Sequence, residues 1–214
     1  MDFDFATLTP QERYKLLGSS ITPRPIAWVA SQSAAGVGNL APFSFFNAMG
    51  ANPPLIALGL ITRADGQLKD TASNILETGE FVVHLVSEAL APAMNITCMD
   101  APADIDETAL AELKTVPSSA VAVPRLADAP VAMECRLYQA IPAGSTTIVL
   151  GEVLHFHIQD AYIDAEKLYV DTVGLDLVAR MHGGGWYARQ SDLFDMPRPV
   201  YEDWQAQRGK TSQG

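Results

Sequence analysis

Short apolar segments of strand length recur along this chain of 214 residues, and few of them are joined by helices. Residues 55–61 (LIALGLI) and 81–86 (FVVHLV) are continuous apolar runs, whereas residues 131–139 (VAMECRLYQ) alternate. Continuous runs of this length fit buried strands, and alternation fits a half-buried strand. A parallel doubly wound sheet needs a helix between successive strands. The pattern therefore predicts a mainly β fold with peripheral helices, built as an antiparallel barrel.

Other segments extend this prediction. Strands are expected over residues 23–31 and 39–46, with a turn over 34–38 between them, and a short strand around 167–170. Residues 145–160 predict one long strand with a bulge at Gly151. In the alternating strand, Glu134 falls on the solvent face and Cys135 on the buried face.

Helix signals are fewer and local. Thr9 and Glu12 form a capping-box pattern with proline at the first helical position, which predicts a helix over 10–17 that ends at Gly18. A second short helix is expected after Leu68, capped by Asp70 or Thr71 and terminated at Gly79. Residues 87–115 predict helix in pieces, the second piece beginning at an acidic cap.

Composition limits the class of protein. The chain is 48% hydrophobic, which permits a substantial core, and no apolar run approaches the roughly 20 residues that span a bilayer. With no repeat or clear linker, we expect a single domain over residues 1–214, including an N-terminal helical segment (1–18) and a loosely ordered tail (197–214). The polar, acidic N-terminus favours a cytoplasmic protein.

Charge and cysteine content exclude several kinds of partner. The net charge of −11 argues against nucleic acid and anionic membranes. Cys98 and Cys135 are the two cysteines, and without a CxxC pairing we expect reduced thiols rather than a disulfide or zinc site. A negatively charged ligand would therefore need a local cationic pocket.

Residues 68–74 (LKDTASN) are the first candidate for such a pocket. A helix start offers unpaired N–H groups and the positive end of the helix dipole. Lys69 adds a charge, and Thr71, Ser73 and Asn74 add polar groups, so a phosphate fits here. The alternative is that Thr71 only caps the helix and Lys69 is solvated.

Residues 39–47 (NLAPFSFFN) are the second candidate, because three phenylalanines stand around Ser44 and Asn47. Strand alternation turns Ser44 away from Phe43 and Phe45, so a polar face could hold a ligand while the rings pack. Pro42 cannot donate to a ladder, so we expect pairing to be interrupted here and backbone groups to become free. The alternative is an ordinary edge strand.

The glycine-rich residues 180–187 (RMHGGGWY) are the third candidate, since Arg180 and His182 add charge to a flexible turn. His155 and His157 share one strand face, which favours an exposed or subunit-contact face over a metal site in the absence of a clear third ligand. His84 is either a satisfied core histidine or a ligand contact. No hydrolase motif or catalytic residue pair is present, and we expect no metal.

Taken in order, five segments resemble the flavin reductase-like family with its FMN-binding split barrel, in the flavoredoxin-like or nitrilotriacetate-monooxygenase component B-like branch. They are PRPIAWVAS (23–31), NLAPFSFFN (39–47), PP (53–54), KDTASNI (69–75) and TGEFVVHLV (78–86). The order and spacing match over Ser19–Val86, and more faintly through LGEVLHFHI and residues 180–187.

The resemblance implies a homodimer that binds FMN near the subunit interface and takes electrons from NAD(P)H, in some members for a separate monooxygenase. The isoalloxazine ring needs flat apolar packing and hydrogen-bond donors at its edge, which residues 39–47 are expected to supply. Carried over by motif position, the flavin-binding residues are Arg24, Ser31, Asn39, Leu40, Ala41, Ser44, Asn47, Lys69, Thr71 and Asn74. Within this set, Lys69, Thr71 and Asn74 match the phosphate side.

The implied reaction is hydride transfer from the nicotinamide to flavin N5, in which the cofactor performs the chemistry. No protein acid or base is required, and Arg180 and His182 are expected only as electrostatic helpers. Two alternatives remain: an FMN electron carrier or sensor that exchanges electrons with a protein partner, and a flavin-free interaction protein on the same barrel. The choice between NADH and NADPH, the tightness of flavin binding and the final acceptor are left open.

Overall fold

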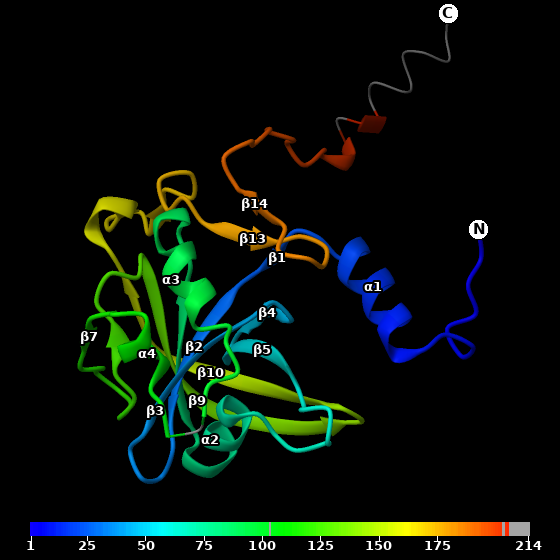
Figure 1. Ribbon diagram of the computed structural model, residues 1–214. Helices are drawn as coiled ribbons and strands as arrows, with labels where there is room; N and C mark the ends of the chain where they lie inside the picture. Colours follow the sequence, from blue (N-terminus) through cyan, green and yellow to red (C-terminus); the bar gives the residue numbers. More distant parts are fainter. Residues whose placement is uncertain (103, 203, 206–214) are drawn as a thin grey trace, which may run out of the picture.

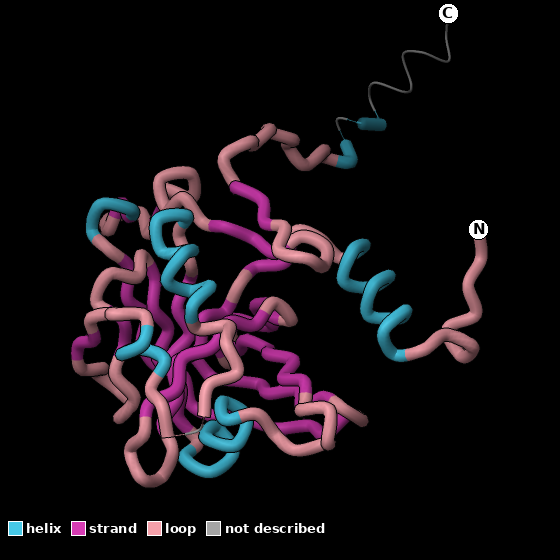
Figure 2. The backbone as a smooth tube through the Cα atoms, in the orientation of Figure 1, coloured by secondary structure: helices cyan, strands magenta, loops and turns pink. Residues whose placement is uncertain are grey.

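The computed structural model describes residues 1–102, 104–202 and 204–205, and a seven-stranded antiparallel sheet forms its centre (Figures 1 and 2). The strands are β2 (Ala27–Gln32), β3 (Gly38–Phe43), β4 (Phe46–Ala51), β5 (Pro54–Ile61), β6 (Glu80–Leu85), β9 (Val131–Ala143) and β10 (Thr146–Ile158). They are ordered β3-β2-β6-β9-β10-β5-β4. Each strand pairs antiparallel with its neighbours, so the predicted mainly β, antiparallel barrel is confirmed.

The two edge strands of this sheet, β3 and β4, follow one another in the chain with only Ser44 and Phe45 between them. The sheet must therefore curl until its edges meet. The carbonyl of Phe45 accepts a 2.7 Å hydrogen bond from the N–H of Gly59 on β5, and a Cβ on Gly59 would lie only 3.0 Å from Cβ of Phe45. A glycine thus permits the close approach at the seam, by which we mean the Ser44–Phe45 bend and its contact with β5.

Because of this closure, the strand predicted over 39–46 is wrong in its extent. The strand ends at Phe43, and a bend separates it from β4. Pro42 does not interrupt the pairing, because it lies opposite Trp28 within β3. The N–H of Leu40 points away from β2 to Glu107, and residues two apart in a strand face the same way. The nitrogen of Pro42 therefore faces the open edge, where no donor is needed.

Two apolar cores lie on opposite faces of β2, which explains why its residues 27–31 are all buried. One core combines Ala27 and Val29 with residues of β5, β6, β9 and β10 and with the second helix, α2 (Asp70–Thr78). The other combines Trp28 and Ala30 with α3 (Ala91–Ile96) and residues 121–129. The helix α2 therefore packs against one face of the sheet and α3 against the other, and both lie at the periphery of the strands in Figure 2.

The first helix, α1 (Pro10–Ser20), lies to one side of the central sheet (Figure 1) and contacts it through Tyr14, whose ring centre is 5.9 Å from that of Phe45. Its predicted capping box is confirmed, since the N–H of Glu12 donates to Thr9 Oγ1 and the N–H of Thr9 donates to the Glu12 carboxylate. The predicted end at Gly18 is wrong by two residues. The carbonyls of Gly18 and Ile21 accept from the guanidinium of Arg24, so an arginine, not a left-handed glycine, satisfies the helix end.

The predicted cap of α2 also differs. Lys69 occupies the N-cap position and makes no side-chain cap, while Asp70 and Thr71 are the first two helical residues. Gly79 ends the helix in the left-handed conformation (φ 76°), as predicted. The acidic cap predicted for a later helix is confirmed, because the Asp106 carboxylate accepts from the N–H of Thr108 at the start of α4 (Glu107–Leu110).

In the long hairpin of β9 and β10, the prediction for Gly151 is confirmed and the prediction for Glu134 is wrong. A register shift lies at Gly151, as expected, and a Cβ there would meet the Phe81 ring at 2.4 Å. Glu134 does not face solvent: its side chain is fully buried and accepts hydrogen bonds from the N–H groups of Ser119 and Ala120. The segment over residues 117–124 covers this face, which the alternation of β9 alone could not reveal.

Smaller elements complete the described chain. They are η1 (Glu88–Leu90), η2 (Asp160–Tyr162), β1 (Arg24–Pro25) paired with β13 (Val178–Arg180) and β14 (Tyr187–Arg189), β11 (Ile163–Asp164) paired with β12 (Tyr169–Val170), and β7 (Thr115–Val116) paired with β8 (Arg125–Leu126). Of the tail predicted over 197–214, residues 203 and 206–214 lie outside the described residues, and residues 201–202 and 204–205 are helical. None of the described helices has the length and apolar character to cross a membrane.

Candidate functional site

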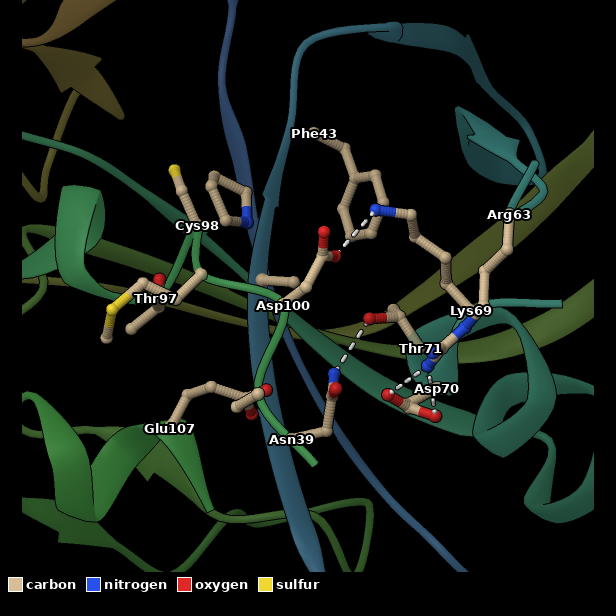
Figure 3. Close-up of a pocket in the computed structure, with 14 residues that line it drawn as sticks. Asn39, Phe43, Arg63, Lys69, Asp70, Thr71, Thr97, Cys98, Asp100 and Glu107 are labelled. Carbon is tan, nitrogen blue, oxygen red and sulfur yellow. Dashed lines mark hydrogen bonds and ion pairs between the residues drawn. The ribbon is translucent and has the colours of Figure 1, made fainter. Parts of the chain in front are cut away.

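A groove runs around the end of β3, where three adjoining hollows share Pro42 and Phe43 as a common wall. The first hollow lies between β3, the start of α2 and the segment after α3, and has a cavity volume of about 140 Å³ (Figure 3). The middle hollow adds Tyr14 and Gly59, and the last adds Arg180 and Tyr187. One elongated ligand could therefore contact a helix N-terminus at one end and an arginine at the other.

The start of α2 makes the first hollow suitable for an anion. The N–H groups of its first turn have no intrahelical partner, and the side chain at the N-cap leaves them uncapped. Lys69 lies here, and its Nζ is 3.3 Å from a carboxylate oxygen of Asp100. Arg63 also lines the hollow and binds both carboxylate oxygens of Asp70, at 3.1 and 2.9 Å. The positive end of the helix dipole and two cations thus meet in one place.

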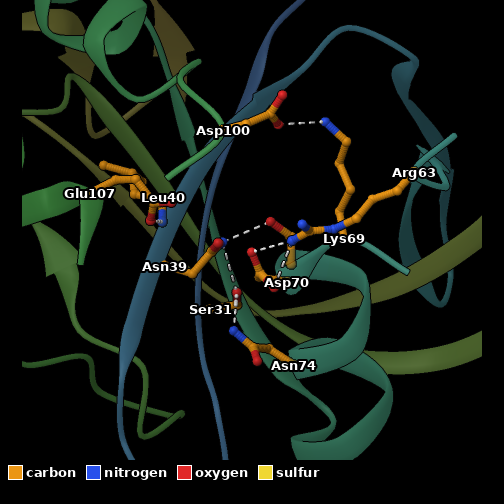
Figure 4. Close-up of polar contacts among 10 residues, drawn as sticks. Ser31, Asn39, Leu40, Arg63, Lys69, Asp70, Asn74, Asp100 and Glu107 are labelled. Carbon is orange, nitrogen blue, oxygen red and sulfur yellow. Dashed lines mark hydrogen bonds and ion pairs between the residues drawn. The ribbon is translucent and has the colours of Figure 1, made fainter. Parts of the chain in front are cut away.

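Behind this hollow, four predicted residues form a buried hydrogen-bonded cluster (Figure 4). Asn39 donates through Nδ2 to Thr71 Oγ1 at 2.7 Å and to Ser31 Oγ at 3.3 Å. Asn74 donates to the same Ser31 hydroxyl at 3.2 Å. Because Thr71 accepts from Asn39, its own O–H proton is left for an acceptor in the hollow. Ser31 and Asn74 do not line the hollow, so they position Asn39 and Thr71.

Leu40 and Ala41 are placed differently from one another. Leu40 is fully buried, and its N–H donates to a Glu107 carboxylate oxygen at 3.0 Å, so this edge group is already bonded. Ala41 lines the first hollow. Glu107 is a lining residue that the sequence interpretation missed. Its burial raises the pKa of the carboxyl group, and the hydrogen bond from Leu40 only partly offsets that effect.

Ser44 lies at the seam, where it lines the middle and last hollows. Its Oγ accepts a 3.3 Å hydrogen bond from Nε of Arg24. Arg24 is 4% exposed and also binds the end of α1, so it holds α1 against the seam instead of presenting a free charge. The structure therefore places Ser44 in the groove and Arg24 behind it.

Asn47 lies on the other side of the seam. It lines a separate, largely apolar hollow that includes Ile21, Met49 and Ile148, and its Oδ1 accepts from the N–H of Ala48. This hollow shares Ser44 and Phe45 with the groove but does not include Lys69. Within one chain, the structure does not bring Asn47 to the phosphate-side residues.

Arg180 and His182 are separated by the structure. The Arg180 guanidinium lies 4.9 Å from the centre of the Tyr187 ring and lines the last hollow with Cys98. His182 is exposed on the glycine turn, where its ring lies 5.7 Å from that of Trp186, and it lines none of the three hollows.

The other histidines have partners. His84 is fully buried, with Nδ1 3.0 Å from the Trp28 carbonyl, while Nε2 accepts from the N–H of Leu126. Burial lowers its pKa to about 4, so it is a neutral core residue. His157 binds the Glu134 carboxylate through Nε2 at 2.6 Å. Among the described residues, no group of three or more possible metal ligands is clustered.

Cys98 and Asp100 line the groove from a segment far along the chain and had no distinguishing sequence signal, whereas Phe43, the shared wall, and Tyr187 belong to stretches that the sequence had singled out. Phe43 belonged to the quoted aromatic run but was expected to pack away from the ligand. Cys98 and Asp100 stand in a segment whose composition is ordinary, so only the tertiary fold brings them to the groove.

Comparisons with known proteins find matches in both sequence and structure. The model of the flavin reductase like domain matches residues 19–173. An uncharacterized protein of Deinococcus radiodurans is 47% identical over 210 residues, covering 96% of this chain and 92% of that protein.

Two solved structures are similar over nearly their whole length. Nitrilotriacetate monooxygenase component B from Bacillus cereus has a TM-score of 0.87 and 36% identity, covering 92% of this chain and 98% of that one. The 2-nitrobenzoate 2-nitroreductase NbaA of Pseudomonas fluorescens has a TM-score of 0.85 and 35% identity, covering 94% and 98%.

Proposed function

Because this chain belongs to the flavin reductase-like family, we propose that it is an FMN-dependent oxidoreductase that takes electrons from NAD(P)H. The observation that carries the proposal is the groove around Phe43, which joins an uncapped helix N-terminus to an aromatic wall. A phosphate and a flat ring system on one molecule match these two ends.

The phosphate end is the first hollow. The uncapped N–H groups of α2, the O–H of Thr71 and the ammonium of Lys69 are the donors there. Asn39 holds Thr71 in place through its 2.7 Å hydrogen bond, so the hydroxyl is oriented before a ligand arrives. These donors fit an FMN phosphate, whose oxygens accept several charge-assisted hydrogen bonds.

The ring end lies along Phe43 and Ser44, with Tyr14 and Tyr187 at its margins. Apolar and aromatic surface there excludes water from a bound ring, and the Ser44 hydroxyl and nearby backbone groups are available to its polar edge. When bound, FMN supplies the redox chemistry by accepting a hydride at N5 from a reduced nicotinamide. The protein's part is to bind and orient the two rings and to place Arg180 where negative charge develops.

Assembly and partners are part of the proposal. The apolar hollow near Asn47 leaves Ile21 62% and Met49 57% exposed, which supports a second copy of this chain covering that face as a homodimer. The similarity to a protein named as a monooxygenase component supports a monooxygenase or another redox protein as the final acceptor.

The first test is an FMN titration of the flavin-stripped protein, followed by quenching of flavin fluorescence. We expect saturable binding of one FMN per chain. The double variant Lys69→Ala/Thr71→Ala should weaken that binding by about tenfold or more, since charge-assisted hydrogen bonds to the phosphate are lost. Ser73→Ala, on an exposed position of the same helix, is the matched control and should leave the affinity unchanged. Equal affinity of the double variant and the control would reject the assigned phosphate end.

The second test measures steady-state oxidation of NADH and of NADPH with excess FMN. Turnover with either donor supports a reductase. Bound flavin without turnover would instead support an electron carrier, and absence of flavin binding would favour a flavin-free interaction protein.

A further inference from the structure

The cations of the first hollow are already paired with carboxylates of the same chain. Lys69 and Arg63 line this hollow together with Asp70, Asp100 and Glu107 (Figure 3). Lys69 pairs with Asp100 and Arg63 with Asp70. A phosphate group, with a charge between about −1.5 and −2 near neutral pH, must therefore enter a hollow whose cations are neutralised.

Asp100 differs from the carboxylate of Asp70 in how far it is exposed to solvent. It reaches Lys69 from the opposite wall, on the segment that follows α3 (Figure 4), and its side chain is 91% exposed. Exposed ion pairs of this kind contribute little to stability and exchange readily with other ions. Asp70, in contrast, is less exposed and holds Arg63 through both oxygens at the first turn of α2.

Asp100 is also not needed to anchor its own segment. Thr97, three residues earlier, is 2% exposed and receives a 2.9 Å hydrogen bond from Nε1 of Trp28. Its hydroxyl donates in turn to the carbonyl of Met94 at 2.8 Å. The segment is therefore attached to the core through Thr97, and the contact of Asp100 with Lys69 lies over the hollow.

We propose that Asp100 is a specificity-determining residue of the flavin site. Its carboxylate pairs with Lys69 at the position where the phosphate of a ligand would bind, so it must be displaced before a phosphorylated flavin can bind. This inference rests on the proposed function. The competition weakens binding of FMN but not of riboflavin, which has the same ring and no phosphate. It makes FMN an exchangeable ligand.

The test compares FMN with riboflavin, both followed by quenching of flavin fluorescence, in the wild type and in Asp100→Asn. We expect the variant to bind FMN about fivefold more tightly, with riboflavin affinity unchanged within a factor of about two. Asp104→Asn, an exposed position four residues away that does not line the hollow, makes the same change of charge and should alter neither affinity. In a Lys69→Ala background, the effect of Asp100→Asn on FMN should fall by at least half.

Each other outcome is informative. If both flavins bind and Asp100→Asn leaves the ratio of their affinities unchanged, or weakens FMN, the inference is wrong while the flavin site stands. An equal gain in Asp104→Asn would assign the effect to overall charge and overturn the role of Asp100. If neither flavin binds the wild type, the proposed function fails and this inference fails with it. Far-UV circular dichroism of each variant verifies that it is folded.

Discussion

The amide of Asn39 donates a 2.7 Å hydrogen bond to the hydroxyl of Thr71, and this bond joins the edge strand β3 to the first turn of α2. Both side chains are almost completely buried, at 8% and 2% exposure. Two of the segments that resemble the family are therefore one structural unit, in which a strand residue orients a helix residue toward the groove.

Replacing Thr71 with valine should test this unit. Valine keeps the shape but leaves the Asn39 amide without the closer of its two acceptors, so we expect a loss of about 1–3 kcal/mol in the free energy of unfolding. Urea unfolding measures it. Ser73→Ala, on the exposed side of α2, should change stability by less than about 0.5 kcal/mol. A Thr71→Val protein as stable as Ser73→Ala would show that the bond contributes nothing.

His84 should make the protein less stable as the pH falls. Burial lowers its pKa from 6.5 to about 4, so between those values the unfolded chain binds a proton that the folded chain does not. The stability that comes from keeping His84 neutral is fully present above pH 6.5. As the pH falls toward 4, the free energy of unfolding should decrease by up to about 3 kcal/mol. Urea unfolding at several pH values should give a shallower slope over this interval in His84→Asn. Parallel slopes in the two proteins would contradict the assignment.

Glu134 should be more important for stability than its position in an alternating strand indicates. Burial disfavours its charge, yet hydrogen bonds from Ser119, His157 and Ala120 together outweigh burial and lower the pKa of the carboxyl group. Glu134→Gln replaces one acceptor oxygen with an NH2 group, which would face the N–H donors of Ser119 and Ala120. We therefore expect a loss of about 2–4 kcal/mol in the free energy of unfolding. Glu152→Gln, on the neighbouring strand, is the control and should be nearly neutral. Similar stabilities would argue against the buried contacts.

Gly151 should not tolerate a side chain. An alanine Cβ would lie 2.4 Å from the ring of Phe81, and we expect Gly151→Ala to cost about 1–3 kcal/mol by overpacking. The double variant Gly151→Ala/Phe81→Leu should recover part of that loss, which a thermal melt can measure. Gly183→Ala, where a Cβ meets nothing within 4 Å, should melt with the wild type. If Phe81→Leu does not restore stability to Gly151→Ala, the loss would come from the backbone conformation at residue 151 and not from overpacking.

Cys98 should report on the groove. It is exposed and lines two hollows, whereas Cys135 is buried, so a thiol reagent should label about one of the two cysteines in the native protein. Although residue Cys98 is exposed, its sulfur is partly desolvated, which raises the pKa of its thiol, so labelling should quicken as the pH rises. FMN should slow labelling at least about threefold if it occupies the groove. Cys98→Ser should abolish the reaction, and labelling that FMN does not affect would place the ligand elsewhere.

Local rules predicted much of this fold. The capping box at Thr9, the left-handed Gly79 and the bulge at Gly151 each depend on a few neighbouring residues, and each is confirmed. The predictions that were wrong depend on distant segments. The strand end at Phe43 is set by closure of the barrel, and the burial of Glu134 is set by a segment around residue 120.

The same distinction applies to the site. Lys69, Thr71 and Asn39 were predicted from helix-start chemistry and from the family resemblance, and the structure brings them together. The ion pair that Lys69 already makes could not be predicted. Its partner Asp100 lies 31 residues away in the sequence, and the contact depends on how α3 leads into the next segment. Sequence patterns indicate which chemical groups are present, whereas contacts between segments decide which of them are free.

At the seam between β3 and β4, residues that line the groove lie outside the main strand pairing of the sheet. On the inner strands of the sheet, a substitution must preserve pairing with strands on both sides, but at Ser44 and Phe45 the chain crosses between the two edge strands and makes few such bonds. Residues lining the groove at this joint can therefore change size without shifting the register of the remaining strands. The shape of the groove beside Ser44 can thus differ between two sequences whose inner strands pair in the same way.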